Sequence, residues 1–482
     1  MSDIFTTPDW VKHAVFYQIF PERFANGDPA RNPENVLPWG ALPTAKSFMG
    51  GDLRGIITHL DYLADLGVTA LYLNPIFHAA SNHKFDTYDY FRIDPHFGDM
   101  ATFHELIDQA HQRGIRVILD AVLNHCGRGF FAFHDILEND AASPYLNWFH
   151  ITKLPLHPYD MTKPANYAGW WNLRSLPKFN TEHPPVRQFL LNVARYWIEQ
   201  GADGWRLDVP NEIDDHDFWR EFRHVVKTAN PEAYIVGEIW EDASIWLDGT
   251  QFDAVMNYPW RDLCHDFFAH ERLDAVHFGQ GLAQLFQRYQ REITLAQFNL
   301  LGSHDTARFI TEAGGDVSRF YPAVLFQMTF PGAPCIYYGD EIGMEGVKDP
   351  GSRACFPWDT AQWNQELHAW FKHCIALRHA HPALRTGRFR TLPTPANRSV
   401  FAFARWNEDE RLIVLLNPKA QPVTLDLPLH ADEAAPGPFA DGVMLTDLLS
   451  EQVYTMRNGV VAQVHVPGRR GVVLHSAHQN EM

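Results

Sequence analysis

The sequence predicts an α/β fold: a (β/α)8 barrel (TIM barrel) with a small domain inserted after strand 3 and a C-terminal antiparallel β-sandwich. Three observations favour this fold. Short apolar runs alternate with longer amphipathic stretches, which is typical of βα units. Eight such runs come before residue 384, and eight βα units close into a barrel. Beyond that point, short runs separated by Pro, Asn and Gly indicate antiparallel strands.

Local patterns predict the barrel elements in order. Over residues 53–66 apolar side chains recur every three or four positions and end at Gly67, which predicts a helix with a C-terminal glycine. Other predicted helices cover 101–113, 186–200, 215–228 and 363–381. The eight predicted strands cover 14–20, 69–73, 115–119, 204–207, 234–236, 252–256, 298–301 and 335–337.

A long segment after the third strand breaks the alternation. It is rich in aromatic residues, Pro and His and has no clean period, and a structureless loop of that length is unusual in a compact domain. We therefore expect an inserted domain B over 125–177, leaning over the C-terminal face of the barrel. The catalytic barrel, domain A, is predicted over 1–124 and 178–383, and the C-terminal β-sandwich, domain C, over 384–482.

Composition excludes several classes of partner. The 482 residues include 40 Lys and Arg against 58 Asp and Glu, a net charge of −18, so we expect neither a nucleic acid nor a membrane surface as partner. The N-terminus lacks the basic and apolar regions of a signal peptide, and no apolar run is long enough to span a membrane. The five Cys have no CxxC spacing and are expected as free thiols. Together these features predict a cytoplasmic protein.

Four acidic residues lie at the ends of predicted strands: Asp120, Asp208, Glu238 and Asp305. Any one of them could simply cap a loop or the helix that follows. A barrel, however, brings the C-terminal ends of its strands to one place, and a partly buried carboxylate needs a partner or a chemical role. We therefore expect these four side chains to converge.

Neighbouring residues suggest different protonation states. Arg206 lies two positions before Asp208 and so on the same face of the strand, where its charge would keep Asp208 ionised as a nucleophile. Glu238 has apolar neighbours and no adjacent cation, so we expect it to hold a proton. His125 and His304 lie near the other two acids, where they either bind hydroxyl groups or only pack.

Two carboxyl groups of opposite protonation state, among aromatic residues and His, are the equipment for glycoside cleavage. One protonates the leaving oxygen, and the other attacks the sugar or activates water. The sequence gives no distance between them, so retention and inversion of configuration both stay open at this point.

Four motifs in one order resemble those of the α-amylase superfamily, glycoside hydrolase family 13: DAVLNH (120–125), GWRLDV (204–209), GEIW (237–240) and SHDT (303–306). The resemblance implies a retaining mechanism on α-glucosidic bonds. It makes Asp208 the nucleophile, Glu238 the general acid/base and Asp305 the stabiliser of the transition state. It also assigns substrate contacts to Tyr88, His83, Asp120, His125, Arg206 and His304.

The segment LPKFN (176–180) resembles a motif of the neopullulanase, cyclomaltodextrinase and maltogenic amylase subgroup. This implies hydrolysis of α-1,4 bonds in cyclodextrins, maltooligosaccharides and related α-glucans, with transglycosylation, and leaves α-1,6 bonds open as a second linkage. The alternatives are a 4-α-glucanotransferase, an exo-α-glucosidase and a non-catalytic sugar-binding relative. Strand 1 begins near residue 14, so any oligomer is not expected to form through the N-terminal β domain usual in this subgroup.

A loop near the N-terminus resembles a structural Ca²⁺ site of the same subgroup, with Asn26, Asp28, Gly50 and Asp52 as ligands. Ca²⁺ prefers oxygen ligands of this kind. However, Arg31 stands where the subgroup often has Asn, so a plain turn without metal is the alternative. No organic cofactor is expected.

Overall fold

The computed structural model describes residues 5–394, 398–429 and 442–477. The chain divides into two compact units. Unit 1 comprises Met1–Val11, Phe16–Met256 and Lys348–Trp358, and unit 2 comprises Lys12–Val15, Asn257–Val347 and Asp359–Met482. The C-terminal domain predicted over 384–482 includes residues 395–397, 430–441 and 478–482, which lie outside the described residues.

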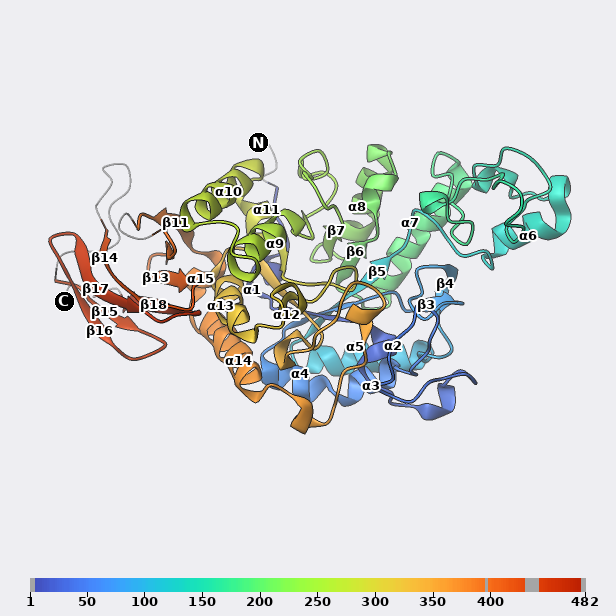
Figure 1. The fold of residues 1–482 in the computed structure, drawn as a ribbon. Helices are drawn as coiled ribbons and strands as arrows, with labels where there is room; N and C mark the ends of the chain where they lie inside the picture. Colours follow the sequence, from blue (N-terminus) through green and yellow to red (C-terminus); the bar gives the residue numbers. More distant parts are fainter. Residues whose placement is uncertain (1–4, 395–397, 430–441, 478–482) are drawn as a thin grey trace. The chain divides into compact units, whose positions relative to one another are not determined.

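Unit 1 contains six parallel strands in the order β8–β7–β6–β5–β2–β1. Of these, β5, β6 and β7 are labelled in Figure 1. Asp120 on β5 pairs with Arg206 on β6, and Leu207 pairs with Gly237 on β7. This register places the carboxyl ends of three neighbouring strands at one edge of the sheet. The strands are β1 (Phe16–Ile19), β2 (Ala70–Leu73), β5 (Arg116–Ala121), β6 (Gly204–Leu207), β7 (Tyr234–Gly237) and β8 (Ala254–Val255).

One predicted helix of unit 1 is divided in the structure, and three short helices were not predicted. The helix expected over 53–66 is two helices, α3 (Leu53–Thr58) and α4 (Leu60–Leu66), separated by His59. The His59 ring stacks on Trp358 with 3.5 Å between ring centroids, a contact that sequence periodicity cannot reveal. The other helices are α1 (Asp9–His13), α2 (Pro21–Phe24), α5 (Met100–Gln112), α6 (Phe131–Asn139), α7 (Pro184–Glu199) and α8 (His216–Ala229), of which α1, α2 and α6 are the three not predicted.

Two segments between strands of unit 1 carry further structure. The hairpin β3 (Phe77–Ala79) and β4 (Thr87–Ile93) follows β2. The aromatic-rich segment after β5 contains α6, and its ends are joined by an isolated bridge between His125 and Lys178. Phe149 makes a second bridge to Phe179, and the two rings stack.

Unit 2 contains one pair of parallel strands, β9 (Phe298–Leu300) and β10 (Ala333–Tyr337), in its described residues. All ten residues of α13 (Phe320–Thr329) are buried, so this helix has no solvent-facing side. A π-helical segment, His265–Ala269, continues directly from α9 (Tyr258–Cys264). The remaining helices are α10 (Ala275–Arg288), α11 (Arg291–Ala296), α12 (Phe309–Glu312), α14 (Gln365–Ala380) and α15 (Pro382–Thr386).

The last eight strands of unit 2 form an antiparallel sheet in the order β11–β12–β13–β18–β15–β16–β17–β14 (red in Figure 1). Buried side chains of β12 and β13 share one core with those of β14 and β17, so the sheet folds over itself as a sandwich. The strands are β11 (Arg388–Leu392), β12 (Phe401–Trp406), β13 (Glu410–Asn417), β14 (Val423–Pro428), β15 (Met444–Asp447), β16 (Val453–Arg457), β17 (Val460–Val466) and β18 (Arg470–Ala477).

Two buried arginines connect elements of unit 2 through backbone carbonyl oxygens. Arg405 on β12 donates to the carbonyl oxygen of Thr329 at 2.6 Å, at the end of α13. Arg378 on α14 donates to the carbonyl oxygen of Gly332 at 2.6 Å. Burial lowers the pKa of Arg378 to about 9 and holds the pKa of Arg405 well below its usual value. Backbone carbonyl dipoles therefore solvate these two guanidinium groups.

Candidate active site

One buried guanidinium organises the acidic residues of unit 1. Arg206 Nη1 lies 2.8 Å from Asp120 Oδ1 and 2.9 Å from Asp208 Oδ1, and Arg206 Nη2 lies 2.9 Å from Glu238 Oε2. The Arg206 side chain has no exposed surface. Three of the four predicted acids, from the ends of β5, β6 and β7, thus converge on one cation. We call this set the Arg206 cluster.

The charges in the Arg206 cluster depend on burial. Burial raises the pKa of Asp120 to about 7, against the opposing effect of Arg206. Burial alone would lower the pKa of Arg206, but the carboxylates around it, Asp120 first, hold that pKa well above its usual value. Arg206 therefore stays charged and supplies the positive charge that Asp208 needs to remain ionised.

The surroundings of Glu238 correct one expectation. We predicted no cation beside Glu238, and this was wrong, because Arg206 on the adjacent strand reaches it. Its carboxylate also accepts hydrogen bonds from the Trp240 indole and from the Val209 N–H, both at 3.1 Å. The contact is lateral, between neighbouring strands, so no adjacent residue in the sequence reveals it.

The turn after Asp208 is strained. Val209 has φ 36° and ψ 50°, the left-handed region that a β-branched residue rarely adopts. Such a conformation costs about 1–3 kcal/mol and is characteristic of functional sites. Here it points the Val209 N–H at the Glu238 carboxylate, so the strained turn supplies a hydrogen-bond donor to one of the two candidate catalytic acids.

A chain of buried polar groups behind the cluster was not predicted. The Tyr72 hydroxyl donates to Asp120 Oδ2 at 2.6 Å and accepts from Asn74 Nδ2 at 3.2 Å. Gln18 Nε2 donates in turn to Asn74 Oδ1 at 2.9 Å. The available signal was the presence of polar side chains within the apolar strand runs YQIF and LYLN. These groups fix the orientation of Asp120.

The predicted residues Tyr88 and His83 lie at the β3–β4 hairpin. A Cβ atom added at Gly127 or Gly129 would lie 2.5 or 2.6 Å from the Tyr88 ring, so these glycines allow the ring to sit against the start of the inserted segment. His83 lies in the loop before β4, and its Nδ1 accepts the Phe85 N–H at 3.1 Å.

His125 is the buried end of a row of three stacked rings, His125, Trp170 and Trp171. Burial lowers its pKa to about 3, so the ring is neutral, and Asn124 Nδ2 lies 3.2 Å from its Nδ1. The ring stacks on Trp170 at 5.3 Å, and Trp170 stacks on Trp171 at 4.6 Å. Trp171 is 74% exposed, which gives the inserted segment a flat apolar face open to solvent.

His304 and Asp305 belong to unit 2, in the loop that follows β9. His304 is buried, and its Nε2 lies 3.1 Å from Asp305 Oδ2. The Asp305 N–H donates to the Ser303 hydroxyl at 3.3 Å, which shapes the SHDT turn. The two predicted residues are therefore paired with each other at the carboxyl end of their strand.

The four residues predicted to bind Ca²⁺ lie around one loop. Asp52 accepts backbone N–H groups of Gly27, Asp28 and Gly55. A Cβ at Gly50 would lie 2.6 Å from Asn26 Nδ2, and the buried Asn26 Oδ1 has no hydrogen-bond partner.

One cation from the protein competes for this loop. The Arg31 guanidinium lies 3.2 Å from Asp28 Oδ2. The uncommitted Asn26 oxygen fits a cation ligand, while Arg31 occupies one of the two carboxylates.

Comparison with known families identifies the family and the fold of the chain. Residues 18–386 match the model of the α-amylase catalytic domain, and residues 389–469 match that of the maltogenic amylase C-terminal domain. The chain belongs to the α-amylase family. Both the predicted resemblance and the fold class, a (β/α)8 barrel followed by an antiparallel β-sandwich, are thereby confirmed.

Several α-glucan hydrolases are similar to this chain over most of its length. A cyclomaltodextrinase from a Bacillus species is 52% identical over 417 residues, covering 86% of this chain and 74% of the relative. An intracellular maltogenic amylase from Bacillus subtilis is 43% identical, covering 86% and 70%. The ligand-free structure of cyclic α-maltosyl-(1→6)-maltose hydrolase from Arthrobacter globiformis has TM-score 0.88 and 42% identity, covering 98% and 100%. The prediction of an α-glucan hydrolase is confirmed at the level of the family.

None of the helices in the described part of the chain combines the length and apolarity needed to cross a bilayer.

Proposed function

We propose that this chain is a retaining hydrolase of α-1,4 and α-1,6 glucosidic bonds in short or cyclic α-glucans. The observation that carries the proposal is the Arg206 cluster, in which two carboxylates at adjacent strand ends share one buried guanidinium. Retaining glycosidases need two closely spaced carboxyl groups, one ionised and one protonated. Family membership supplies the type of bond.

In the first half of this proposed reaction, Asp208 attacks the anomeric carbon while Glu238 protonates the leaving oxygen. Two negative charges side by side are unfavourable, so an ionised Asp208 favours the protonated form of Glu238. Once Asp208 has formed the glycosyl ester its charge is gone, and Arg206 then favours ionised Glu238. That form takes a proton from the water that releases the sugar.

Other residues are assigned supporting roles in this mechanism. Asp305 would bind sugar hydroxyls and stabilise the transition state, with the buried His304 beside it. Neutral His125 offers hydrogen bonds without adding charge, and Tyr88 offers a ring face to the sugar. Arg206 and Asp120 are fully buried, so we assign them positioning roles beneath the sugar.

The proposed substrate class rests on the relatives and on the exposed aromatic face. One relative is named for cyclomaltodextrin and another for a cyclic maltosyl-maltose with a 1→6 bond. Trp171 presents an exposed ring beyond His125 and Trp170, and aromatic faces stack well on the apolar faces of sugars.

The test is a time course of products from β-cyclodextrin, pullulan and maltotriose, resolved by chromatography, with NMR assignment of the first anomer formed. We expect maltose and glucose with retained configuration. Ladders of longer products would identify a 4-α-glucanotransferase, and glucose as sole product from linear chains an exo-α-glucosidase.

Asp208→Asn tests the catalytic assignment. We expect the rate to fall at least about 10⁴-fold with the thermal transition preserved, because a nucleophile is lost and little packing changes. Asp217→Asn, on an exposed carboxylate of α8, is the matched control and should keep normal rates. Near-normal turnover by Asp208→Asn, or sugar binding without cleavage by the unmodified protein, would overturn the proposal.

We propose a weak structural Ca²⁺ site at the loop of Asn26, Asp28, Gly50 and Asp52. The unpartnered Asn26 oxygen supports it, and Arg31 weakens it by competing for Asp28. Millimolar CaCl₂ after EDTA treatment should raise Tm by about 1–3 °C, and Arg31→Asn should increase that response. No response in either protein would favour the plain turn.

We also propose that the protein acts in the cytoplasm, because the Bacillus subtilis relative is named as intracellular. Detection of the native protein in cytosolic rather than secreted fractions tests this. Light scattering of the purified chain tests whether an oligomer forms.

A further inference from the structure

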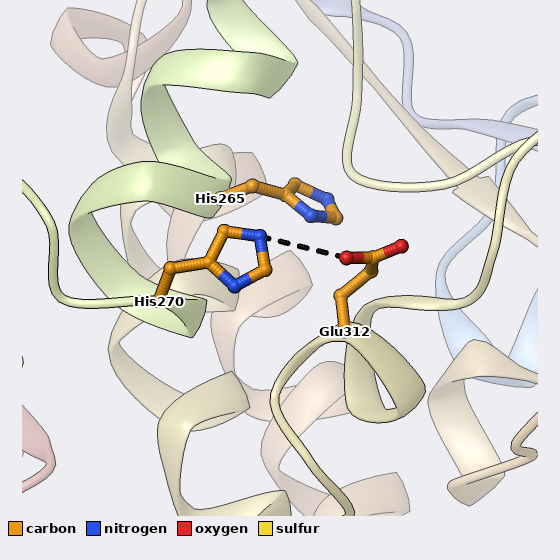
Figure 2. Close-up of side chains that lie close together, drawn as sticks. All are labelled: His265, His270 and Glu312. Carbon is orange, nitrogen blue, oxygen red and sulfur yellow. Dashed lines mark ion pairs between the residues drawn. The ribbon is translucent and has the colours of Figure 1, made fainter.

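Two histidines and a glutamate meet in unit 2, and none of the three is assigned to catalysis (Figure 2). His265 begins the π-helical segment, His270 follows its end, and Glu312 ends α12. One possible ligand atom from each residue lies within 4.8 Å of those of the other two. His270 Nε2 and Glu312 Oε2 are 3.5 Å apart.

The π-helical turn brings the two histidines together. The His270 N–H donates to the His265 carbonyl oxygen at 2.8 Å, which is the i to i+5 bond of a π-helix. The two rings then lie with 6.2 Å between their centroids. An ordinary α-helix places residues five apart on different faces, so the rare turn is what makes this pair possible.

One ring nitrogen of His265 is already anchored by the backbone. Its Nε2 lies 2.7 Å from the Leu301 carbonyl oxygen and donates to it. Nδ1 is therefore left with the lone pair. Ligating histidines commonly anchor their second ring nitrogen on a carbonyl in this way.

We propose that His265, His270 and Glu312 bind one divalent transition-metal ion of the Zn²⁺ class, with water completing the coordination. Two imidazoles and a carboxylate are a familiar three-residue zinc set, whereas Ca²⁺ and Mg²⁺ prefer oxygen ligands alone. Tetrahedral coordination at about 2.0–2.1 Å requires ligand atoms about 3.3 Å apart. The His270–Glu312 pair is already near that separation, and both side chains are partly exposed and can adjust.

A second cluster of the same composition is less suited to bind a metal ion. His381, Glu410 and His475 also lie together. There, however, Glu410 Oε2 already accepts His381 Nδ1 at 2.7 Å, and Glu410 Oε1 accepts the Ala383 N–H at 2.8 Å. That carboxylate is committed to capping α15, whereas Glu312 is 35% exposed.

An ion bound here would tie α12 to the end of α9. Helix α12 follows the SHDT turn, and its first residue, Phe309, packs on the His265 ring at 5.0 Å. Binding would therefore stabilise the segment that carries Asp305. The ion takes no part in any step of the proposed glycosidase chemistry, so the chelated enzyme should remain active.

The experiment uses the purified full chain after EDTA treatment and dialysis, titrated with ZnCl₂ alone. By calorimetry we expect one high-affinity Zn²⁺ site per chain, the tight class of sites. At saturation we expect Tm to rise by about 2–5 °C. Co²⁺ in place of Zn²⁺ should give a visible absorption band. MgCl₂ at the same concentration should change none of these readings.

Variants assign the site. His270→Ala and Glu312→Gln alter partly exposed side chains, and each should weaken the tight class at least tenfold and remove the Co²⁺ band. His134→Ala is the matched control and should bind normally. His134 is exposed, its Nε2 lies 3.9 Å from Glu138 Oε1, and it belongs to neither three-residue cluster found among the described residues. Absence of a tight class in the unmodified chain, or unchanged binding by both variants, would overturn the proposal.

Discussion

Two regions of the molecule bury arginine in opposite ways. In unit 1, Arg206 contacts three carboxylates, and its positive charge is matched by their negative charge. In unit 2, Arg405 contacts backbone carbonyl oxygens, 2.6 Å from that of Thr329, and its charge is solvated by dipoles. Both side chains are fully buried. The contrast separates a guanidinium that controls ionisable groups from one that only connects elements.

The energetic consequences differ as well. Removing one partner of a buried ion pair leaves the other charge uncompensated, at a cost of about 3–5 kcal/mol. Removing a donor from neutral carbonyl groups leaves only unsatisfied acceptors, at about 1–3 kcal/mol. The same substitution at the two positions therefore tests which kind of burial each arginine represents.

Arg206→Met should have the largest effect. It leaves Asp120, Asp208 and Glu238 without their shared cation, so we expect a loss of activity of at least about 10³-fold and of stability of about 3–5 kcal/mol. Urea unfolding and the rate on maltotriose provide the two measurements. Arg206→Lys, which keeps the charge but not the two-pronged geometry, should recover stability better than activity.

Arg405→Met should reduce stability without reducing the catalytic rate. We expect the free energy of unfolding to fall by about 1–3 kcal/mol, because the Thr329 carbonyl loses its donor, while the rate per folded molecule stays within about twofold. If Arg405→Met reduced the rate as strongly as Arg206→Met, the distinction between the two regions would not hold.

Glu410→Gln should have the smallest effect on stability, and that effect should depend on pH. Burial raises the pKa of Glu410, but hydrogen bonds from His381, His475 and the Ala383 N–H outweigh it and lower that pKa to about 2. A pKa below its ordinary value stabilises the fold above pH 4.5, and that stabilisation is lost as pH falls toward 2.

We therefore expect Glu410→Gln to lower stability at pH 7 by about 1–2 kcal/mol, a value reduced for solvent screening, and to lower it less at pH 3. Thermal scans of both proteins at the two pH values give the comparison. An equal difference at both values would show that the Glu410 charge does not contribute.

The sequence predicted the acids of the Arg206 cluster because strand ends are visible in it. An apolar run followed directly by Asp120, Asp208 or Glu238 places each carboxylate at the end of a parallel strand. The Arg206–Glu238 contact was missed because it depends on register between strands, and the Gln18–Asn74–Tyr72 chain because buried polar groups resemble interruptions of a strand.

The break between α3 and α4 and the left-handed turn at Val209 could not be predicted from the sequence either. The apolar spacing of residues 53–66 continues across His59, and only its stacking on the distant Trp358 accompanies the break. Nothing in the sequence indicates that Val209 adopts a left-handed conformation, since Gly, Asn or Asp is usual there.

The burial of α13 on every side bears on how the chain can be cut. The β-sandwich covers part of this helix: α13 contacts β13 and β18, and Gly471 on β18 lies against Leu325. A fragment ending before β11 would leave that apolar surface facing water. We therefore expect the C-terminal sandwich to resist removal as a separable module, with shortened versions accumulating in inclusion bodies and with proteases degrading both parts together.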